Sequence, residues 1–351
     1  MSIWDSYPAA YRKKEVETIL KAAAAGECVS IVGLSGAGKS NLLGFLAHRV
    51  HADTCFLLVD CNDLPAADLP ALYAVLLDAL GADITPNPSF HALIDAAARC
   101  LELNPSGLSI LIDRFDVFNT ATSESKTVAA NLRALRDRFK YELTFDLATR
   151  RPLEPASELA ELFTGSTLWL GALDPEDASW SVSEYASRRR LDWNEETVWQ
   201  ILDLSQGYPS MLRAVCESFA AGVPLDISAM RSSDPVKRRV DEFWADMPLP
   251  EYLRASHLEH HPLLSRGAPL RINAADLTAA EQHLLDYFIA HPDQICSKDA
   301  LIQAVWPEEK LIAGLRDDSL SQLVHRLREK LDTPDTKHIQ TIPGRGYRYQ
   351  Q

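Results

Sequence analysis

The chain has 351 residues, a length that predicts two or three domains. Hydrophobic residues make up 46% of it and charged residues 24%, so its composition is that of a globular protein and excludes disordered, collagen-like and coiled-coil classes. Its 35 basic and 49 acidic residues give a net charge of -14. That charge excludes a uniformly basic protein that coats nucleic acid or an anionic membrane, although it allows a local basic surface.

No stretch approaches 18 uncharged apolar residues, and the first residues lack the basic and apolar regions of a signal peptide. We therefore expect a soluble protein with no membrane partner, in a cytoplasm of bacterial type. The six cysteines form no C-x-x-C pair, which predicts reduced thiols and neither a zinc site nor a disulfide framework.

Five short apolar runs alternate with longer amphipathic segments in the first half of the chain. This alternation is typical of a parallel sheet with helices on both faces, and it predicts a multidomain α/β protein. The expected strands are residues 28–32, 55–60, 109–113, 143–149 and 166–170, and the expected covering helices are residues 42–50, 71–80, 93–103 and 129–139.

The strand pattern stops near Asp174, and helical patterns joined by Gly207-Tyr208-Pro209 follow it. A small helical subdomain is therefore expected after the sheet. The predicted boundaries are 1–172 for the sheet domain, 173–246 for the helical lid, 247–270 for a linker and the start of the last domain, and 271–351 for that domain.

The segment from Gly33 to Ser40 fits the phosphate-loop pattern G-x-x-x-x-G-K-[ST], between a predicted strand and a predicted helix. Glycines let the backbone N–H groups face the phosphates, and the helix N-terminus adds its positive end. Lys39 would neutralise the β and γ phosphates, and Ser40 would bind Mg²⁺. The residues expected to hold ATP or ADP here are Gly33, Ser35, Gly36, Ala37, Gly38, Lys39, Ser40 and Asn41.

A carboxylate at the end of another buried strand should complete the magnesium site, and Asp113 has that position. The usual ATPase has Glu directly after this Asp, whereas this chain has Arg114. Asp116 is the candidate catalytic base, and the alternative is a solvated loop carboxylate. We therefore expect nucleotide binding with slow hydrolysis.

Arg150 follows the next predicted strand and is a candidate for contact with the γ-phosphate. The alternative is a solvated residue at the start of a helix. The arginine run Arg188-Arg189-Arg190 is interpreted as a charged helix face in preference to an arginine finger that acts on a neighbouring molecule.

The order of these motifs resembles the STAND and Orc/Cdc6-like branch of ASCE P-loop ATPases, which is related to AAA+. The resemblance covers about residues 8 to 245. It implies an extra strand between the phosphate-loop strand and the Asp113 strand, and it implies that Pro209 in the lid approaches the nucleotide. The run from Tyr11 to Glu15 is similar to the family's Gly-Arg-x-x-Glu start near the adenine, without its Gly.

The last 80 residues resemble the OmpR-type winged-helix domain of bacterial response regulators. The resemblance extends from Leu277-Thr278 to the Gly344–Tyr347 run, and it implies a recognition helix at 320–331 and a wing hairpin around Arg345. Glycines on both sides of Arg345 would let a tight hairpin present its guanidinium to DNA.

The pattern of the recognition helix agrees with double-stranded DNA as a partner. An apolar stripe with helical spacing leaves polar side chains outward. Residues 326–348 contain six basic and three acidic residues, an excess within an acidic chain. The alternative is a winged helix that contacts only protein, because acidic residues at 317, 318 and 329 lie near the helix. The candidate DNA contacts are Ser321, Gln322, His325, Arg326, Arg328, Arg345 and Tyr347.

Three histidines, His257, His260 and His261, are interpreted as part of a solvated linker in preference to a metal site. For the whole chain, the favoured function is a nucleotide-controlled DNA-binding regulator of transcription, with nucleotide-dependent self-association and an unidentified signal or protein partner. The alternatives are a DNA-recruiting or DNA-loading ATPase, and a defence-type switch whose winged helix contacts protein.

Overall fold

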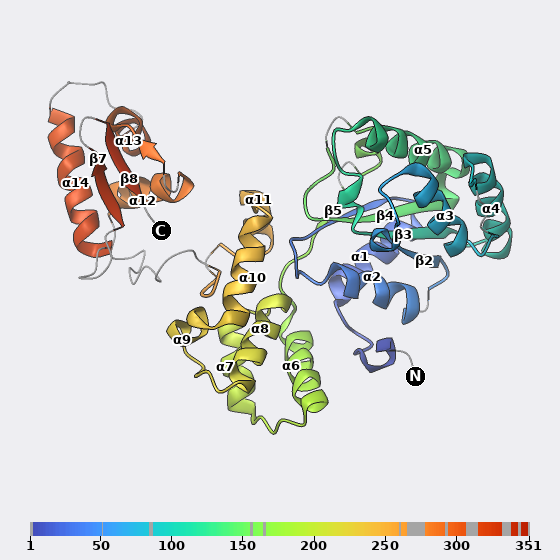
Figure 1. Ribbon diagram of the computed structural model, residues 1–351, viewed down its shortest axis with the longest axis horizontal. Coiled ribbons are helices and arrows are strands. Elements are labelled where there is room, and N and C mark those ends of the chain that lie inside the picture. The colour runs from blue at the N-terminus through green and yellow to red at the C-terminus, as the bar shows by residue number, and fades with distance from the viewer. Residues whose placement is uncertain are drawn as a thin grey trace. The chain divides into compact units, whose positions relative to one another are not determined.

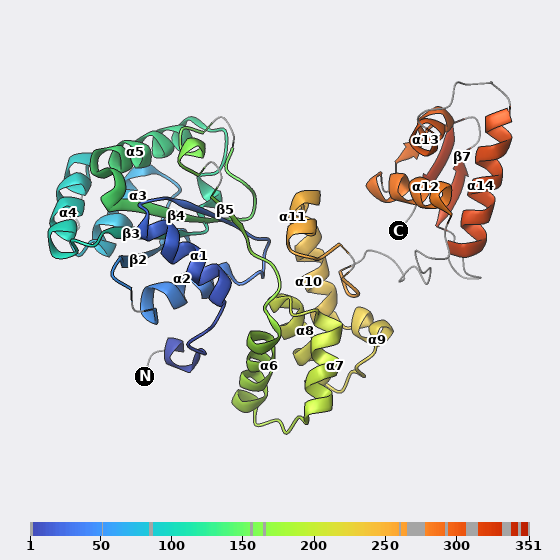
Figure 2. The same ribbon diagram turned by 180° about the vertical axis from the view of Figure 1, so that it is seen from behind.

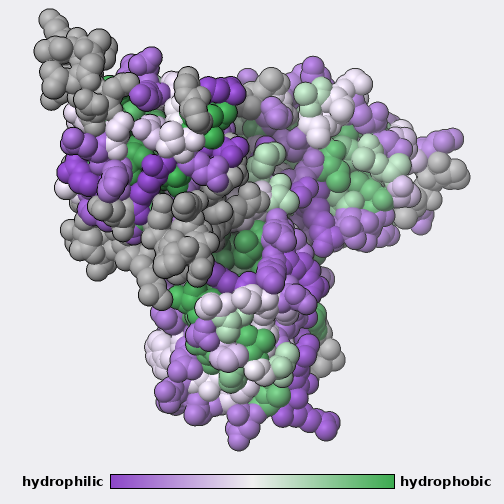
Figure 3. Space-filling model, turned by 60° about the vertical axis from the view of Figure 1, so that its left-hand side comes forward, coloured by the Kyte–Doolittle hydropathy of each residue, from purple (hydrophilic) through white to green (hydrophobic). Residues whose placement is uncertain are grey.

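The computed structural model divides the chain into two compact units, Met1–Leu264 and Ser265–Gln351, each with its own buried core. No helix among the described residues is long and apolar enough to cross a membrane. The surface seen in Figure 3 is largely hydrophilic, with hydrophobic residues in scattered groups. The described residues are 3–50, 52–83, 87–154, 157–163, 166–259, 261–264, 278–291, 294–306, 315–331, 338–342 and 345–349.

A five-stranded parallel sheet forms the centre of the first unit (Figure 1). Its spatial order is β2-β3-β4-β1-β5, so β4 lies between β1 and β3 as the family resemblance implies. Each strand begins and ends within one residue of its predicted range, and the predicted α/β fold is confirmed. The strands are β1 (Val29–Val32), β2 (Cys55–Asp60), β3 (Leu108–Asp113), β4 (Leu143–Thr149) and β5 (Thr167–Trp169).

Helices cover both faces of this sheet (Figures 1 and 2). Leu111 of β3 belongs to the buried cluster of α1 and α2, whereas its neighbours Ile110 and Ile112 belong to the cluster of α3, α4 and α5. Successive strand side chains point to opposite faces, so the two helix groups lie on opposite sides. These helices are α1 (Lys13–Ala24), α2 (Lys39–His48), α3 (Leu69–Ala79), α4 (Phe90–Leu103) and α5 (Ser123–Phe139), with 3-10 turns at Ile3–Ser6, Cys61–Asp63, Phe115–Val117, Lys140–Glu142 and Ala160–Phe163.

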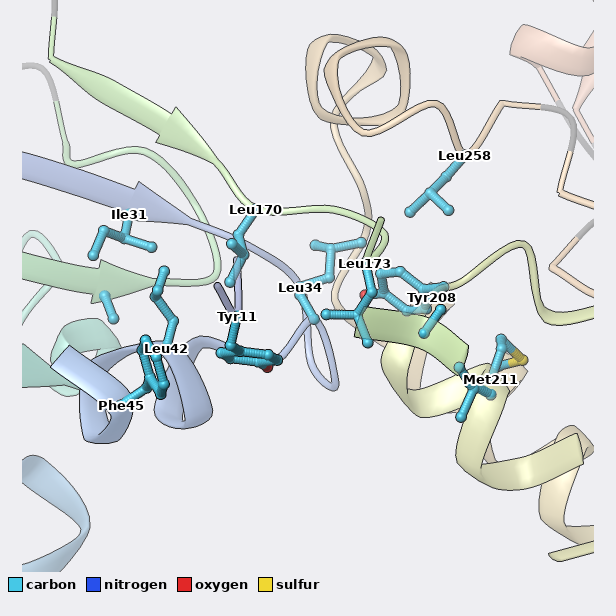
Figure 4. Packing of buried hydrophobic residues seen from close by; sticks show 14 of the residues in the cluster. Tyr11, Ile31, Leu34, Leu42, Phe45, Leu170, Leu173, Tyr208, Met211 and Leu258 are labelled. Atoms are coloured by element: carbon cyan, nitrogen blue, oxygen red, sulfur yellow. The ribbon is translucent and has the colours of Figure 1, made fainter. Parts of the chain in front are cut away.

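The helical lid shares its core with one face of the sheet. Tyr208 and Met211 of the lid belong to the same buried cluster as Ile31 and Leu42, and Figure 4 shows Tyr208 beside Leu173. Caps and prolines define the helix starts, as at α6, where the Asp174 carboxylate accepts the Asp177 N–H at 2.9 Å. The lid helices are α6 (Pro175–Arg189), α7 (Glu195–Ser205), α8 (Pro209–Ala220), α9 (Ile227–Ser232), α10 (Asp234–Ala245) and α11 (Pro250–Ala255).

The segment from Met247 to Leu264 packs within the first unit, although its histidines and turn residues predict a linker. The Tyr252 side chain is buried, and its hydroxyl donates to the Leu170 carbonyl at 2.8 Å. Leu258, Leu263 and Leu264 are also buried. Apolar side chains at irregular spacing anchor this segment, so no helical or strand period indicates its burial.

His261 is buried within the same segment and is not solvated. Its Nε2 lies 2.8 Å from the Ser205 carbonyl, and its Nδ1 accepts the Leu263 N–H at 3.1 Å. Burial lowers the pKa of His261 to about 4, which keeps the ring neutral. His257 is exposed, and His260 lies outside the described residues. No group of three or more His, Cys, Asp or Glu side chains that could hold a metal ion occurs among the described residues.

In its described residues, the second unit combines three helices with a small antiparallel sheet of order β6-β8-β7. Thr278 and Glu281 form a capping box at the start of α12, and the Lys330 ammonium lies 2.7 Å from the Glu281 carboxylate. This architecture confirms the predicted winged helix. Its elements are α12 (Ala279–Ala290), β6 (Ile295–Cys296), α13 (Lys298–Val305), α14 (Leu315–Leu331), β7 (Ile339–Ile342) and β8 (Gly346–Tyr349).

A buried carboxyl group in the sheet generates the first testable prediction. Asp146 of β4 accepts the Val29 N–H at 3.1 Å and the Ser109 hydroxyl at 2.7 Å. Burial raises the pKa of Asp146 to about 7, above its unfolded value, so the folded state binds the proton more tightly. Its stabilising contribution is therefore complete at low pH and is lost as the pH rises to about 7.

We expect Asp146→Asn to abolish this loss, because the amide stays neutral and its oxygen still accepts the Val29 N–H. Relative to the variant, the wild type should lose roughly 1.4 kcal/mol of unfolding free energy per pH unit between about pH 5 and 7, and no more above 7. Urea unfolding of both proteins at pH 5, 6, 7 and 8 measures this difference. A difference that does not vary with pH would contradict the prediction.

Candidate nucleotide and DNA sites

The phosphate loop lies between β1 and α2, at the carboxyl-end edge of the sheet. Gly36 and Gly38 have φ values of +78° and +91°, which a residue with a side chain adopts only under strain. These conformations curl the loop, and α2 begins directly after it at Lys39. Such a curl turns successive N–H groups toward one point, as an anion site requires.

Lys39 lies inside this curl, with only 9% of its surface exposed. Its ammonium donates to the carbonyl oxygen of Gly33, and to that of Leu34 at 3.2 Å. Burial lowers the pKa of Lys39, whereas the nearby carboxylates of Asp116 and Asp113 raise it. The acidic neighbours therefore favour the charged form of Lys39, against the effect of burial.

Asp113 ends β3 next to the loop, where its side chain is almost fully buried. Burial raises the pKa of this carboxyl, and a hydrogen bond with the Ser40 side chain lowers it. Ser40 and Asp113 are the two residues predicted to bind Mg²⁺, and they are in direct contact. Hydroxyl and carboxylate oxygens suit this hard cation, so the pair fits a magnesium site.

Asp116 and Arg150 are also brought together at this edge. The Asp116 carboxylate accepts the Arg150 N–H at 2.7 Å, and the Arg150 Nε lies 3.6 Å from its second oxygen. Parallel pairing explains the meeting, because β1 and β3 both flank β4 and all three strands end on the same side. Residues more than 100 positions apart thus converge on the phosphate loop.

A cavity of about 550 Å³ collects most of the predicted nucleotide residues. This volume lies within the usual range for small-molecule sites. Gly33 and Ala37 do not line it: the Gly33 N–H donates to Thr149, and the Ala37 carbonyl accepts from Arg12. The lining residues are Ser35, Gly36, Gly38, Lys39, Ser40, Asn41, Asp113, Arg114, Asp116, Val117, Arg150, Pro209, Ser210, Arg213 and Arg239.

Arg12 binds the backbone of the phosphate loop without lining the cavity, a role that the sequence does not indicate. Its guanidinium is buried and donates to the carbonyls of Ala37 at 2.8 Å and Gly171 at 3.0 Å. The backbone N–H of Arg12 donates to the Asp177 carboxylate at 2.6 Å. The similarity of the Tyr11–Glu15 run to the family pattern is the only signal, and it points to the adenine. In this structure Arg12 holds the phosphate loop, the start of α6 and the end of β5 together.

The lid contacts the loop through residues that no motif reveals. The Tyr208 hydroxyl donates to the Ser35 carbonyl at 3.3 Å, and the Ser210 N–H donates to the Gly36 carbonyl at 3.1 Å. Asp246 accepts the Ser35 N–H at 2.6 Å. Pro209, the residue predicted to approach the nucleotide, begins α8 and lines the cavity between these contacts.

The arginine run at the end of α6 does not line this cavity. Arg188 pairs with Glu184 of its own helix at 2.7 Å, and the Arg189 guanidinium lies over the Tyr185 ring. Arg190 ends the helix in the left-handed conformation. These contacts agree with the interpretation as a charged helix face.

The outward side of α14 presents the predicted base-reading residues. Ser321, Gln322, His325 and Arg326 are exposed and line one shallow depression. The apolar stripe on the other side is buried in the core of the unit, as predicted. It consists of Leu320, Leu323, Val324, Leu327 and Leu331.

Arg328 and Tyr347 connect this helix to the hairpin of β7 and β8. The Arg328 guanidinium donates to the Ile339 carbonyl at 3.0 Å and to the Thr341 hydroxyl at 2.8 Å, and it lies over the Tyr347 ring. Tyr347 is buried, with its hydroxyl 3.3 Å from that of Ser321. Both residues thus position the helix against the wing, where Arg345 is exposed.

Residues 273–349 match the family model described as "Transcriptional regulatory protein, C terminal". The second unit therefore carries the winged-helix domain of transcription regulators, in agreement with the resemblance seen in the sequence. The match covers this unit and none of the first.

Two curated proteins are similar to part of the chain. The sensory transduction protein BceR of Bacillus subtilis is 33% identical over 75 residues, which are 21% of this chain and 31% of that protein. The phosphate regulon transcriptional regulatory protein PhoB of Klebsiella pneumoniae is 28% identical over 90 residues, 25% of this chain and 36% of that protein. The chain spans about a third of the length of these relatives.

The chain is also similar to solved structures, one of them a Walker-type ATPase. This ATPase of Pyrococcus abyssi has 14% identity and a TM-score of 0.49, covering 96% of this chain and 92% of its own. Cdc6p from Pyrobaculum aerophilum has 13% identity and a TM-score of 0.41, and the match covers 96% of this chain and 89% of the Cdc6p chain. At this level of similarity, the nucleotide site is supported by the geometry of this chain's own residues alone.

Asp116 gives the second prediction, because it is the candidate catalytic base from the sequence and it lines this cavity. We expect Asp116→Asn to reduce ATP hydrolysis about 100-fold or more, since the amide cannot accept a proton. ATP should still bind, because the amide oxygen can still accept the Arg150 N–H. Phosphate release and equilibrium binding measure the two effects.

The matched control is Asp63→Asn, which changes the same side chain at an exposed position. It should leave both quantities unchanged. Wild-type turnover in the Asp116 variant would show that another base, or none, activates the water.

Proposed function

We propose that the chain is a nucleotide-controlled DNA-binding regulator of transcription, of STAND type. ATP or ADP binds with Mg²⁺ at the phosphate loop, and the second unit binds double-stranded DNA. The state of the nucleotide sets the affinity for DNA. The observation that carries the proposal is the convergence of Lys39, Ser40, Asp113 and Arg150 on one cavity, in a chain that also has a winged helix.

The charges at the cavity support a nucleotide with its metal. Lys39 and Arg150 supply cations for the phosphates, and Ser40 with Asp113 supplies oxygen ligands for Mg²⁺. Asp113 is buried and close to other carboxylates, and a bound cation would relieve the cost of its burial.

Slow hydrolysis is part of the same proposal. Arg114 follows Asp113 where the usual ATPase has Glu, and its guanidinium lies 3.5 Å from Asp60. Asp116 already accepts the Arg150 N–H. A site that lacks this Glu, and whose candidate base is already engaged by Arg150, would hydrolyse ATP slowly and keep it bound for a long time, which suits a switch better than a motor.

DNA recognition is supported by the exposed face of α14. Its four outward residues carry the hydrogen-bonding groups that read base edges in a major groove, while Arg345 extends from the wing. Such a partner would place the protein with a bacterial chromosome, in the cytoplasm. Nucleotide-dependent self-association, and a signal molecule or protein that sets the nucleotide state, remain predictions from the sequence.

The experiment that tests the function measures binding of the full chain to genomic DNA fragments with no nucleotide, with ADP and with a non-hydrolysable ATP analogue. Nucleotide-dependent binding to one promoter-like site would support the proposal. ATP-dependent binding without sequence preference would favour a DNA-loading ATPase instead. No DNA binding in any state would favour a winged helix that contacts protein.

Lys39 provides the third prediction. Lys39→Ala removes the main cation of the phosphate loop, and we expect no measurable ATP binding at micromolar nucleotide. Isothermal calorimetry with Mg²⁺ measures the affinity. Lys126→Ala, which removes an exposed lysine of α5, is the control and should bind as the wild type does. An unchanged affinity in the Lys39 variant would exclude the phosphate-loop site.

The fourth prediction separates base reading from phosphate contact on DNA. Gln322→Ala should cost about 1 to 3 kcal/mol of binding free energy on the preferred sequence only, because base contacts carry specificity. Arg345→Ala should weaken binding to every sequence and reduce the salt dependence, because fewer counterions are released. Fluorescence anisotropy over a salt series measures both.

Arg99→Ala, which removes an exposed arginine of the first unit, is the control for the wing variant. It should leave the salt slope unchanged. Equal losses for Gln322→Ala on preferred and random DNA would contradict a base-reading role for this residue.

A further inference from the structure

Asp246 brings a carboxylate from the lid onto the phosphate loop. It lies directly after α10, and its side chain is only 7% exposed. One oxygen accepts the Ser35 N–H at 2.6 Å, and the other accepts the Arg150 guanidinium at 3.0 Å. Its backbone carbonyl also accepts from the Arg151 guanidinium at 3.1 Å. A single residue thus joins the lid to the loop and to the end of β4.

The two donors that bind this carboxylate, the Ser35 N–H and the Arg150 guanidinium, can also bind a phosphate. Ser35 belongs to the loop whose N–H groups converge on the phosphate position, and Arg150 is the cation beside the same cavity. A carboxylate that accepts a backbone N–H and an arginine makes the contacts that a phosphate oxygen would make. Asp246 therefore occupies donors that an incoming phosphate would need.

The Asp246 carboxylate and a terminal phosphate exclude each other from these donors, because both are negatively charged. Asp246, Asp113 and Asp116 all lie near enough to Lys39 to raise its pKa. Asp113 is in contact with Ser40 and belongs to the proposed magnesium site, whereas Asp246 is bonded to the loop and to Arg150. A terminal phosphate at these donors would meet a carboxylate of the same sign, and like charges in a poorly solvated site repel.

We propose that Asp246 makes the site discriminate between nucleoside triphosphates and diphosphates. This inference rests on the proposed function, and it specifies how the same site is regulated. A diphosphate leaves Asp246 on Ser35 and Arg150. The γ-phosphate of a triphosphate competes for both donors and displaces the carboxylate, which separates the end of α10 from the loop.

The position of Asp246 connects this exchange to the rest of the chain. Met247, the next residue, has a φ of +47° and begins the segment that runs to Leu264. In that segment, the Tyr252 hydroxyl donates to the Leu170 carbonyl next to the sheet. The segment directly precedes the second unit in the sequence. Release of Asp246 would therefore loosen the start of the segment that leads to the DNA-binding domain.

The test compares nucleotide affinities of the full chain and of Asp246→Asn, by calorimetry with Mg²⁺. Asparagine keeps an oxygen for the Ser35 N–H and removes the charge. We expect affinity for a non-hydrolysable ATP analogue to rise about tenfold, because the repulsion is lost, and affinity for ADP to stay within about twofold. The control is Asp241→Asn, which removes the same charge from an exposed position on α10 and should change neither.

Each other outcome has a defined meaning. Equal changes for both nucleotides, or no change, would overturn the inference, because Asp246 would then only hold the lid. If the variant does not fold, Asp246→Ser gives the same comparison with a shorter neutral side chain. Absence of Lys39-dependent binding in the wild type would overturn the proposed function and the inference together, whereas Lys39-dependent binding with an unchanged ratio would overturn the inference alone.

Discussion

The backbone of the phosphate loop is bonded from two sides, and the cavity depends on this arrangement. From the sheet, the Gly33 N–H donates to Thr149 while Arg12 holds the Ala37 carbonyl. From the lid, the Tyr208 hydroxyl donates to the Ser35 carbonyl and the Ser210 N–H donates to the Gly36 carbonyl. Sheet and lid therefore meet at the loop as well as in their shared core, and a ligand that changed the loop would change a contact between them.

Electrostatics at the cavity make that contact sensitive to phosphate and metal. Burial lowers the pKa of Lys39 and raises that of Asp113, whereas the opposite charges nearby shift each pKa the other way. Asp116 and Asp246 share Arg150 between them. A phosphate with its metal adds charges of both signs to this network, so the pairs must rearrange when it binds.

The second unit has a buried core of its own. Within it, Arg328 and Tyr347 position the recognition helix against the hairpin. These contacts fix the helix relative to the hairpin. Control of DNA binding by nucleotide would then act on where the domain is presented or on how many copies are assembled, and not on the shape of the reading helix.

The sequence by itself determined the strands of the sheet, the phosphate loop, Asp113 and the winged helix, because each depends on a local apolar period or a fixed spacing. Tertiary structure alone decided how Arg12 and Asp246 act, because their partners are distant in the sequence: Ala37 is 25 residues from Arg12, and Ser35 is 211 residues from Asp246. It also placed Met247–Leu264 in the first unit, where scattered apolar side chains without a period find a core. Local patterns indicate which groups a chain contains, whereas packing decides which distant groups share one site.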